Sequence, residues 1–523
     1  MDNGIGNWPT IPALLAARVA TAPEATFVHF GGEAISYAEI DARSDRVATG
    51  WLRLGIGRGD RIAIAATNSP DWIVAHLAAA KIGAVLVTLN VVYREREFTH
   101  MLTQSGARAL ICDAESNGFE FGPFLDQLRP DIPTVEHLVF LGGDEVPGGA
   151  RWSDLAATEP DPALLACAAE GVRPADPAVI LYTSGTTGTP KGATITHASL
   201  LASAAAQAER FEQTAADVIL GVMPFNHVGG LTCTLGSTLV TGGAIALLPR
   251  FHPDLVVDAM AGAGVTMFVG VPTMYKMVLG TDSVAGVDMS SVRLCVVGGS
   301  NLEPALAEQV AARFDGVRIA NLYGMSETSG ACVISPPGDS LETVGRSIGT
   351  MTGEFEGRVV DDRNNPLGPG EAGELQVRGG CVAAGYWQLP DESAATFHAD
   401  GWLATGDIAS MSEDGHVTLL GRQKEMYVRG GYNVYPAEVE NVLVADPTVA
   451  MAAVIGVPDE TFGESGYAFV VPAAGATVDV ESLLERCRLA LAKYKVPDGV
   501  EVVDGLPMTP AGKIRKVALT PRI

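Results

Sequence analysis

Basic side chains are scarce in this chain of 523 residues. Lys and Arg total 35 against 61 Asp and Glu, which gives a formal net charge of −26. Such an acidic balance argues against general binding to nucleic acid or to anionic membranes. Any anionic ligand must therefore be held by a local group of residues.

Paired cysteines are also missing. The seven cysteines are scattered, without a C-x-x-C pair and without a histidine at the spacing of a zinc site. This usage predicts a reducing, cytoplasmic compartment and no structural zinc. The N-terminus lacks a basic stretch followed by an apolar one, so the sequence predicts no signal peptide.

Charge is absent altogether from residues 218 to 249, which contain no Asp, Glu, Lys or Arg. Pro224, Asn226, His227 and several Gly and Thr residues interrupt this stretch. We therefore interpret it as a buried strand, loop, helix and strand, and expect no integral membrane segment.

Strand-like apolar runs alternate with helix-like ones through most of the chain up to about residue 320. Such alternation predicts an α/β fold, with parallel sheets covered by helices and ligands at the carboxyl ends of the strands. The expected strands are 61–66, 84–88, 178–182, 218–222, 244–248, 265–269, 293–297 and 318–322, with helices at 71–81, from about 197, and at 302–314.

The pattern changes twice further along. Short runs at 355–360, 373–378 and 416–420 are separated by Asp, Asn, Gly and Pro, which predicts a β-rich subdomain over about 345–421. After it, helices near 436–445 and 480–491 and strands near 452 and 468 predict a compact α+β unit. We therefore divide the chain into a large domain, 1–421, and a small mobile domain, 422–523.

The most informative stretch is TSGTTGTPKG at residues 183–192. Its glycines open backbone conformations closed to other residues, its hydroxyls offer donors, and Lys191 adds a positive charge. A loop of this kind between a strand and a helix suits an anion. Taken alone, it is as typical of a surface turn as of a phosphate site.

The loop does not match the Walker phosphate pattern, which needs Gly-Lys-Ser/Thr five residues after its first Gly. Counting from Gly185 leads to Pro190, and Lys191 is followed by Gly192. The hydroxyl that usually holds magnesium is therefore missing. This weakens the nucleotide triphosphatase interpretation but leaves phosphate binding open.

Four later stretches share the character of this loop. They read NLYGMSET at 321–328, GWLATGD at 401–407, GRQKEMYVRGGYNVYPAEVE at 421–440 and PMTPAGKIRK at 507–516. Together with TSGTTGTPKG, in this order and spacing, they closely resemble the adenylate-forming superfamily of acyl-CoA synthetases. The resemblance spans nearly the whole chain.

The resemblance implies a two-step reaction with ATP, Mg²⁺ and coenzyme A. A carboxylate attacks the α-phosphate of ATP to give acyl-AMP and pyrophosphate, and the coenzyme A thiol then displaces AMP. A carboxylate of pKa about 4 is already ionised at neutral pH, so the first step needs positioning and charge neutralisation rather than a general base.

The resemblance also assigns the catalytic and nucleotide-binding residues. Lys513 would serve adenylation and Glu327 would bind Mg²⁺, while Tyr323 would lie along the adenine and Asp407 would accept hydrogen bonds from the ribose. The remaining positions for the phosphates and the nucleoside are Thr183, Ser184, Gly185, Thr186, Thr187, Gly188, Lys191, Gly298, Gly299, Ser300, Asn321, Gly324, Ser326 and Arg422.

Lys424 falls at the expected hinge between the two domains, and Gly430 and Gly431 fall in the segment expected at the coenzyme A channel. Rotation about the hinge would present Lys513 for the first step and the glycine segment for the second. Read without the resemblance, Lys513 and Lys424 are solvated surface lysines.

The acyl pocket is expected near His227, Gly229, Gly230 and Val269. His227 either gates the pocket mouth or is a satisfied core histidine. No fixed charge is evident in these stretches, which favours an apolar acyl or aryl acid, with a fatty acid slightly preferred.

The sequence leaves two alternative functions and the oligomeric state open. The chain could load a carrier protein instead of coenzyme A, although no carrier segment follows Lys513 in the sequence. It could also be a non-catalytic, nucleotide-binding regulatory protein, which the presence of Glu327, Asp407, Arg422 and Lys513 argues against. A homodimer is possible.

Overall fold

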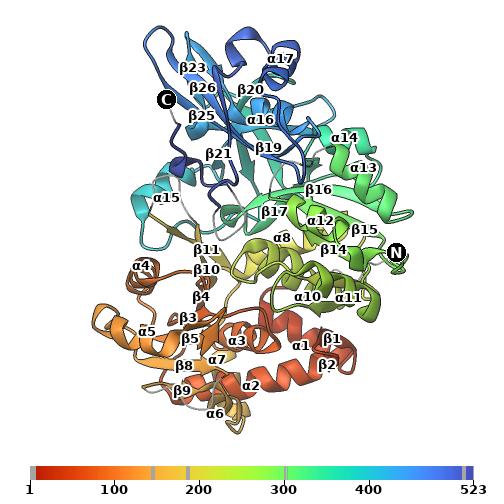
Figure 1. The fold of residues 1–523 in the computed structure, drawn as a ribbon. Helices are drawn as coiled ribbons and strands as arrows, with labels where there is room; N and C mark the ends of the chain where they lie inside the picture. Colours follow the sequence, from red (N-terminus) through yellow and green to blue (C-terminus); the bar gives the residue numbers. More distant parts are fainter. Residues whose placement is uncertain are drawn as a thin grey trace.

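Two large sheets form one end of the molecule (Figure 1). The computed structural model describes residues 8–142, 148–183, 189–299, 302, 304–508 and 514–521. The larger sheet has nine strands in the order β18-β17-β16-β15-β14-β12-β13-β1-β2. They are β1 (Thr26–Phe30), β2 (Glu33–Ser36), β12 (Val218–Gly221), β13 (Ala244–Leu247), β14 (Met267–Gly270), β15 (Leu294–Gly298), β16 (Arg318–Met325), β17 (Gly330–Ile334) and β18 (Thr350–Met351).

The second large sheet has seven strands in the order β11-β10-β4-β3-β5-β8-β9. Both sheets are parallel in their interior, as the alternating sequence pattern predicts, and antiparallel only at edges. The strands are β3 (Arg61–Ala65), β4 (Val85–Thr88), β5 (Ala109–Asp113), β8 (His137–Leu141), β9 (Ala150–Arg151), β10 (Pro177–Thr183) and β11 (Lys191–Thr196).

The main core lies between these sheets, where helices fill the space. Trp72, Leu200 and Leu239 of three of these helices share one apolar cluster with Ile64 of β3 and Ile245 of β13. The helices that contribute to it are α1 (Ile11–Thr21), α2 (Tyr37–Arg53), α3 (Pro70–Lys81), α6 (Trp152–Ala156), α8 (His197–Arg210) and α10 (Ser237–Thr241).

Other helices pack beside the same sheets. α11 (Pro253–Ala263), α12 (Pro272–Leu279), α13 (Pro304–Arg313) and α14 (Leu341–Arg346) share an apolar cluster with the nine-stranded sheet. α4 (Glu95–Ser105) and α5 (Phe121–Leu128) do so with the seven-stranded sheet. The remaining small elements of this region are the β6 (Glu115–Ser116) and β7 (Phe119–Glu120) hairpin and α7 (Pro162–Ala169).

The uncharged stretch at 218–249 folds as predicted. It forms β12, the short helix α9 (Val228–Gly230), a π-helical segment (Leu231–Gly236), α10 and β13. Within the ranges described above, no helix is both long and apolar enough to cross a membrane. Most residues of the uncharged stretch are buried in the protein core.

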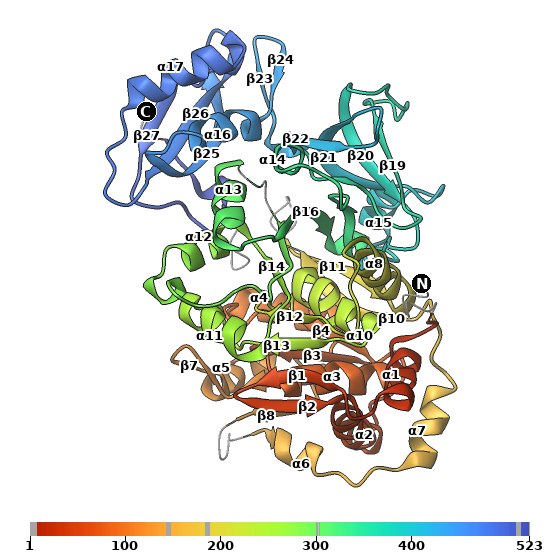
Figure 2. The ribbon, with the colours of Figure 1, turned by 90° about the vertical axis from the view of Figure 1, so that its right-hand side faces the viewer.

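Two smaller sheets follow at the other end of the molecule (Figure 2). The predicted β-rich region is a four-stranded antiparallel sheet, and the α+β unit after it is a five-stranded sheet with two helices; the boundary at 421/422 stays a prediction. The elements are β19 (Glu356–Val360), β20 (Ala372–Arg378), α15 (Pro390–Thr396), β21 (Leu403–Met411), β22 (Val417–Arg422), β23 (Tyr427–Arg429), β24 (Tyr432–Val434), α16 (Pro436–Val444), β25 (Val449–Asp459), β26 (Gly463–Pro472), α17 (Val480–Ala490) and β27 (Gly499–Val502).

One local prediction was wrong. The glycine-rich loop at 183–192 does not lead from a strand into a helix, because β11 lies between the loop and α8 and pairs antiparallel with β10. The alternating apolar and β-branched residues of Lys191–Thr196 form this extra strand, and Thr196 then caps α8 by accepting from the Ser199 N–H. The loop therefore closes a hairpin and has no helix N-terminus behind it.

Two buried histidines in the main core make stability depend on pH. Burial lowers the pKa of His76 to about 3 and that of His197 to about 4. Below the unfolded value of about 6.5, the unfolded chain takes up protons that the folded core excludes, so stability is present at neutral pH and lost as pH falls. Between pH 7 and pH 5 each histidine should remove about 2 kcal/mol of unfolding free energy.

Urea unfolding followed by tryptophan fluorescence measures this effect, since the Trp72 ring centre lies 6.0 Å from that of His76. Between pH 7 and pH 5 the free energy of unfolding should fall in the unaltered protein by about 2 kcal/mol more than in His76→Leu. The exposed His252 provides a matched control, and His252→Leu should follow the unaltered protein. Equal pH slopes for all three proteins would contradict the prediction.

Candidate active site

The end of β16 brings five of the predicted residues into one short segment. Asn321, Tyr323 and Gly324 lie on the strand, and Ser326 and Glu327 lie on the single turn that follows it, Ser326–Thr328. A Cβ at Gly324 would come within 2.0 Å of the carbonyl oxygen of the facing strand β17, so the close approach of the two strands requires glycine there. The turn therefore starts from a tightly fixed strand end.

Glu327 is buried, with 5% of its surface exposed, and its carboxylate has a tyrosine partner. The Tyr386 hydroxyl donates to Glu327 Oε1 at 2.7 Å. Burial raises the pKa of Glu327, and the hydrogen bond from Tyr386 opposes that rise. A carboxylate in this position is a hard oxygen donor of the kind that Mg²⁺ uses beside phosphates.

Lys191 belongs to the same group. Its Nζ lies 5.0 Å from the ring centre of Tyr386, and Tyr386 forms a bridge with Ala193 in the same strand. Tyr386 is not among the residues predicted from the sequence. Its only local signal is an aromatic residue directly after Gly385, at φ +126°, in the Gly-Tyr-Trp stretch after β20.

The two residues predicted to hold the ribose face each other across β21 and β22. Asp407 pairs with Arg422 in the sheet register, and Arg422 Nε lies 3.2 Å from Asp407 Oδ1. The Tyr323 hydroxyl donates to Asp407 Oδ2 at 2.6 Å. The predicted adenine and ribose positions are therefore adjacent, although Tyr323 and Asp407 come from different sheets.

The predicted phosphate loop is described only at its two ends. Thr183 and Lys191 are the last paired residues of the hairpin, and the Thr183 hydroxyl donates to the Lys191 carbonyl oxygen at 3.4 Å. The predicted residues between them, Ser184, Gly185, Thr186, Thr187 and Gly188, lie outside the described residues. The hairpin ends nevertheless place Lys191 beside Tyr386 and hence close to Glu327.

A neighbouring strand end carries two further predicted residues. Gly298 pairs with Leu322 across β15 and β16, and a Cβ at Gly298 would lie 3.1 Å from the Leu322 carbonyl oxygen. Gly299 follows at φ +80°, a left-handed conformation that favours glycine. Ser300 and Lys513 lie outside the described residues.

The predicted hinge lies between the two smaller sheets. Lys424 is exposed on a single turn, Gln423–Glu425, that connects β22 with β23. Gly430 and Gly431 then form the two-residue turn of the β23–β24 hairpin at φ +58° and +86°. Two consecutive positive φ angles are typical of a type I′ turn, which explains the pair of glycines without reference to a channel.

The predicted acyl-pocket residues come from two neighbouring parts of the large sheet. His227 precedes α9 and accepts the Gly229 N–H at Nδ1 (3.1 Å), while Val269 is buried on β14. A Cβ at Gly230 would lie 2.3 Å from the Pro224 carbonyl oxygen, so this glycine packs against backbone. At Gly229 the nearest atom would be the flexible Met223 Cε at 3.0 Å. Of the two glycines, Gly229 thus has the more adaptable surroundings.

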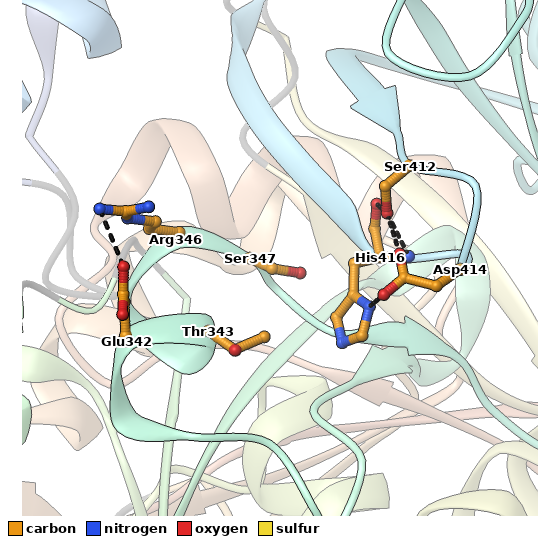
Figure 3. Close-up of a pocket in the computed structure, with 7 residues that line it drawn as sticks. All are labelled: Glu342, Thr343, Arg346, Ser347, Ser412, Asp414 and His416. Carbon is orange, nitrogen blue, oxygen red and sulfur yellow. Dashed lines mark hydrogen bonds and ion pairs between the residues drawn. The ribbon is translucent and has the colours of Figure 1, made fainter.

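A separate surface pocket of about 250 Å³ lies between α14 and the β21–β22 hairpin (Figure 3). Arg346 and Glu342 of the helix contact each other at one side of the pocket, and His416 and Asp414 of the hairpin contact each other at the other side. His416 Nε2 also lies 3.0 Å from Asp339 Oδ1. No residue predicted for the active site lines this pocket.

Comparison with known proteins gives a match along almost the whole chain. The profile of the family described as AMP-binding enzyme matches residues 15–387, and that of the AMP-binding enzyme C-terminal domain matches 438–513. A feruloyl-CoA synthase of an Amycolatopsis species is 35% identical, over 98% of both chains. A methyl-dioxo-octahydro-inden-yl propanoyl:CoA ligase of Mycobacterium tuberculosis is 34% identical, over 98% of this chain and 99% of the relative.

A more distant relative and a solved structure are also similar to this chain. The medium-chain acyl-CoA ligase ACSF2 of Mus musculus is 30% identical, over 93% of this chain and 82% of its own. The crystal structure of the anthranilate CoA ligase AuaEII in complex with anthranoyl-AMP has a TM-score of 0.88 at 25% identity, over 99% of this chain and 98% of that one. This chain and that structure thus share the α/β fold, including the small C-terminal unit, over nearly their whole length.

Proposed function

Since this chain belongs to the AMP-binding enzyme family, within its CoA-ligase group, and is an AMP-forming acid–thiol ligase, we propose that it joins an apolar aryl or ring-bearing carboxylic acid to coenzyme A. The first step forms acyl-AMP and pyrophosphate from ATP. The second transfers the acyl group to the thiol and releases AMP.

The observation that carries the nucleotide part of this proposal is the convergence of two side-chain groups from three sheets. Tyr323, Asp407 and Arg422 form a row joined by a hydrogen bond and an ion pair. It suits a base and a sugar, since a carboxylate accepts hydrogen bonds and a guanidinium donates them. Lys191 lies over the ring of Tyr386, and Glu327 accepts a hydrogen bond from the Tyr386 hydroxyl. The second group suits a triphosphate, because it pairs a cation with a buried oxygen ligand.

In the first step these residues position and neutralise rather than move protons. The acid arrives ionised, so its oxygen needs only an aligned α-phosphate. Lys191 places positive charge at the phosphates, and Glu327, oriented by Tyr386, would hold Mg²⁺. When bound, Mg²⁺ would supply positive charge that offsets the charge developing on pyrophosphate. Lys513 would add positive charge at the α-phosphate.

An apolar acid body is supported by the residues around the predicted pocket. His227 and Gly229 lie within the stretch at 218–249, and Val269 lies on β14, which pairs with β12 of that stretch. The stretch has no Asp, Glu, Lys or Arg to pair with a second charge on the acid. Ring-bearing acids are favoured over fatty acids by the names of the relatives at 35% and 34% identity and of the structure with anthranoyl-AMP. The medium-chain ligase is less similar, at 30% identity.

A pyrophosphate-release screen tests this proposal. The panel contains cinnamic-type, bicyclic propanoic and linear saturated acids, each with and without coenzyme A, and mass spectrometry identifies the thioester. The ring-bearing acids should exceed the linear ones by about tenfold or more in kcat/KM. Preference for linear acids would contradict the proposed substrate class. Acylation of a carrier protein in place of coenzyme A would contradict the proposal that coenzyme A is the acyl acceptor.

Gly229→Val should narrow the acyl pocket. The added side chain would meet Met223 Cε and His227 Nδ1, at 3.0 and 3.3 Å from its Cβ, and would project further into the predicted pocket. We expect kcat/KM for bulky ring acids to fall about tenfold or more, and that for slender linear acids to fall less. The control is Gly262→Val on α11, where a Cβ would have no atom within 4 Å. An equal fall for both acid classes would contradict the pocket assignment.

A further inference from the structure

The tail of the chain is fastened to the predicted hinge segment by one largely buried lysine. Lys516 Nζ lies 2.6 Å from Glu425 Oε2 and 2.8 Å from Glu440 Oε1. The Lys516 side chain is 16% exposed, against 18% for Glu440 and 37% for Glu425. One cation thus connects the tail, the turn that holds Lys424, and helix α16.

The two carboxylates differ in how firmly they are held. Glu440 Oε1 also accepts the Val454 N–H at 2.7 Å, which ties α16 to β25. Glu425 belongs to the hinge turn, next to Lys424, and its carboxylate pairs with Lys516 and interacts with the charge of Arg422. Burial opposes the charge on Lys516, but the two carboxylates raise its pKa above the ordinary value. The lysine therefore stays charged and links a fixed carboxylate to a hinge carboxylate.

The described residues on the two sides of 509–513, the segment that contains Lys513, are bonded to each other. Met508 and Ile514 form an antiparallel bridge, and the Arg515 N–H donates to the Pro507 carbonyl oxygen at 2.7 Å. Ile514 packs against the small cluster of Ala453, Phe469 and Leu506. The two sides therefore meet immediately before the residue that is bonded to the hinge.

We propose that Lys516 is a positioning residue for adenylation, which fixes the backbone directly after Lys513 to the hinge turn through Glu425. This inference rests on the function proposed above. Because Glu425 directly follows Lys424, rotation at the hinge carries the Glu425 carboxylate, the Lys516 ammonium and this backbone together. The angle of the hinge then sets the place of the backbone at 514–516, which directly follows Lys513, and this is the preorganisation that an electrostatic catalyst needs.

Glu425→Gln is the most selective variant, because it weakens the link to the hinge and leaves Lys516 paired with the buried Glu440. Removing Lys516 itself would leave a buried carboxylate unpaired and could unfold the small unit. Acid-dependent exchange of pyrophosphate into ATP measures adenylation, and coenzyme A consumption with supplied acyl-AMP measures thioester formation. We expect the adenylation kcat to fall about tenfold, with the KM for ATP and the thioester step changed less than about twofold.

Two further variants separate positioning from stability. Lys516→Arg keeps the charge and both carboxylate partners, and should retain more than about half of the adenylation rate. Asp446→Asn makes the same carboxylate-to-amide change in the pair with Arg486, whose Nη2 lies 3.2 Å from Asp446 Oδ2 in the same unit. It should leave both half-reactions within about twofold of the unaltered enzyme.

Equal loss of both half-reactions in Glu425→Gln, or no loss in either, would overturn the positioning role. So would the same selective loss in Asp446→Asn. Failure of the underlying function has a different signature, because the unaltered protein would then show no acid-dependent pyrophosphate exchange with any acid of the panel. The two failures are therefore distinguishable in one set of assays.

Discussion

Replacing Lys513 by alanine is expected to lower acyl-AMP formation by about a thousandfold. A unit charge about 4 Å from a phosphate is worth about 4 kcal/mol at a protein-like dielectric, and that energy corresponds to three powers of ten in rate. Conversion of supplied acyl-AMP to the thioester should fall less than about threefold, because the predicted hinge rotation would present a different face of the small domain for that step.

Pyrophosphate exchange and coenzyme A consumption measure the two steps separately. Lys493→Ala is a matched control, since Lys493 is an exposed lysine in the same C-terminal unit. It should change neither rate by more than about twofold. Equal loss of both steps in Lys513→Ala would refute the division of labour between the two closures of the small domain.

Glu327→Gln is expected to lower adenylation by about a hundredfold without loss of stability. Glutamine can still accept the hydrogen bond from Tyr386, but it removes the charge that would bind Mg²⁺. Because the carboxylate is buried and its pKa is raised, neutralising it removes a desolvation penalty. The melting temperature should therefore stay equal or rise while activity falls, and the Mg²⁺ concentration for half-maximal rate should increase.

Tyr386→Phe is the companion to this variant. It keeps the Glu327 charge and the ring near Lys191, and removes only the hydroxyl that orients the carboxylate. A loss of about tenfold is expected, intermediate between the unaltered enzyme and Glu327→Gln. Full adenylation by Glu327→Gln at low Mg²⁺, or a marked fall in its melting temperature, would contradict the assignment of Glu327 as a metal ligand.

Sequence alone predicted most strands of the parallel sheets, because buried strands such as Val85–Thr88 and Leu294–Gly298 are uninterrupted apolar runs. Strand β11 was missed because it directly follows a loop of glycine and threonine, and only its pairing with β10 distinguishes it from that loop. An edge strand of this kind depends on its neighbour more than on its own residues.

The residues of the candidate site could likewise be predicted only where they stand in a local sequence motif. Asp407 and Glu327 are recognisable because they stand in motifs, and the fold brings both toward the end of β16. Tyr386 and Lys516 stand 59 and 91 residues away from the partners they contact. A tyrosine after glycine and a lysine in a basic tail carry no local signal of such contacts. The hinge, the coenzyme A channel and the domain boundary stay predictions.

The hydrogen bond from Tyr323 to Asp407 joins the nine-stranded sheet to the four-stranded sheet across 84 residues of sequence. A nucleotide with its base at Tyr323 and its sugar at Asp407 would bind residues of both sheets at once. Ligand binding then adds to the stability of both, by about 2.7 kcal/mol at a hundred times the dissociation constant. The loaded protein should accordingly melt at a higher temperature than the empty one, so that resistance to proteolysis reports nucleotide occupancy.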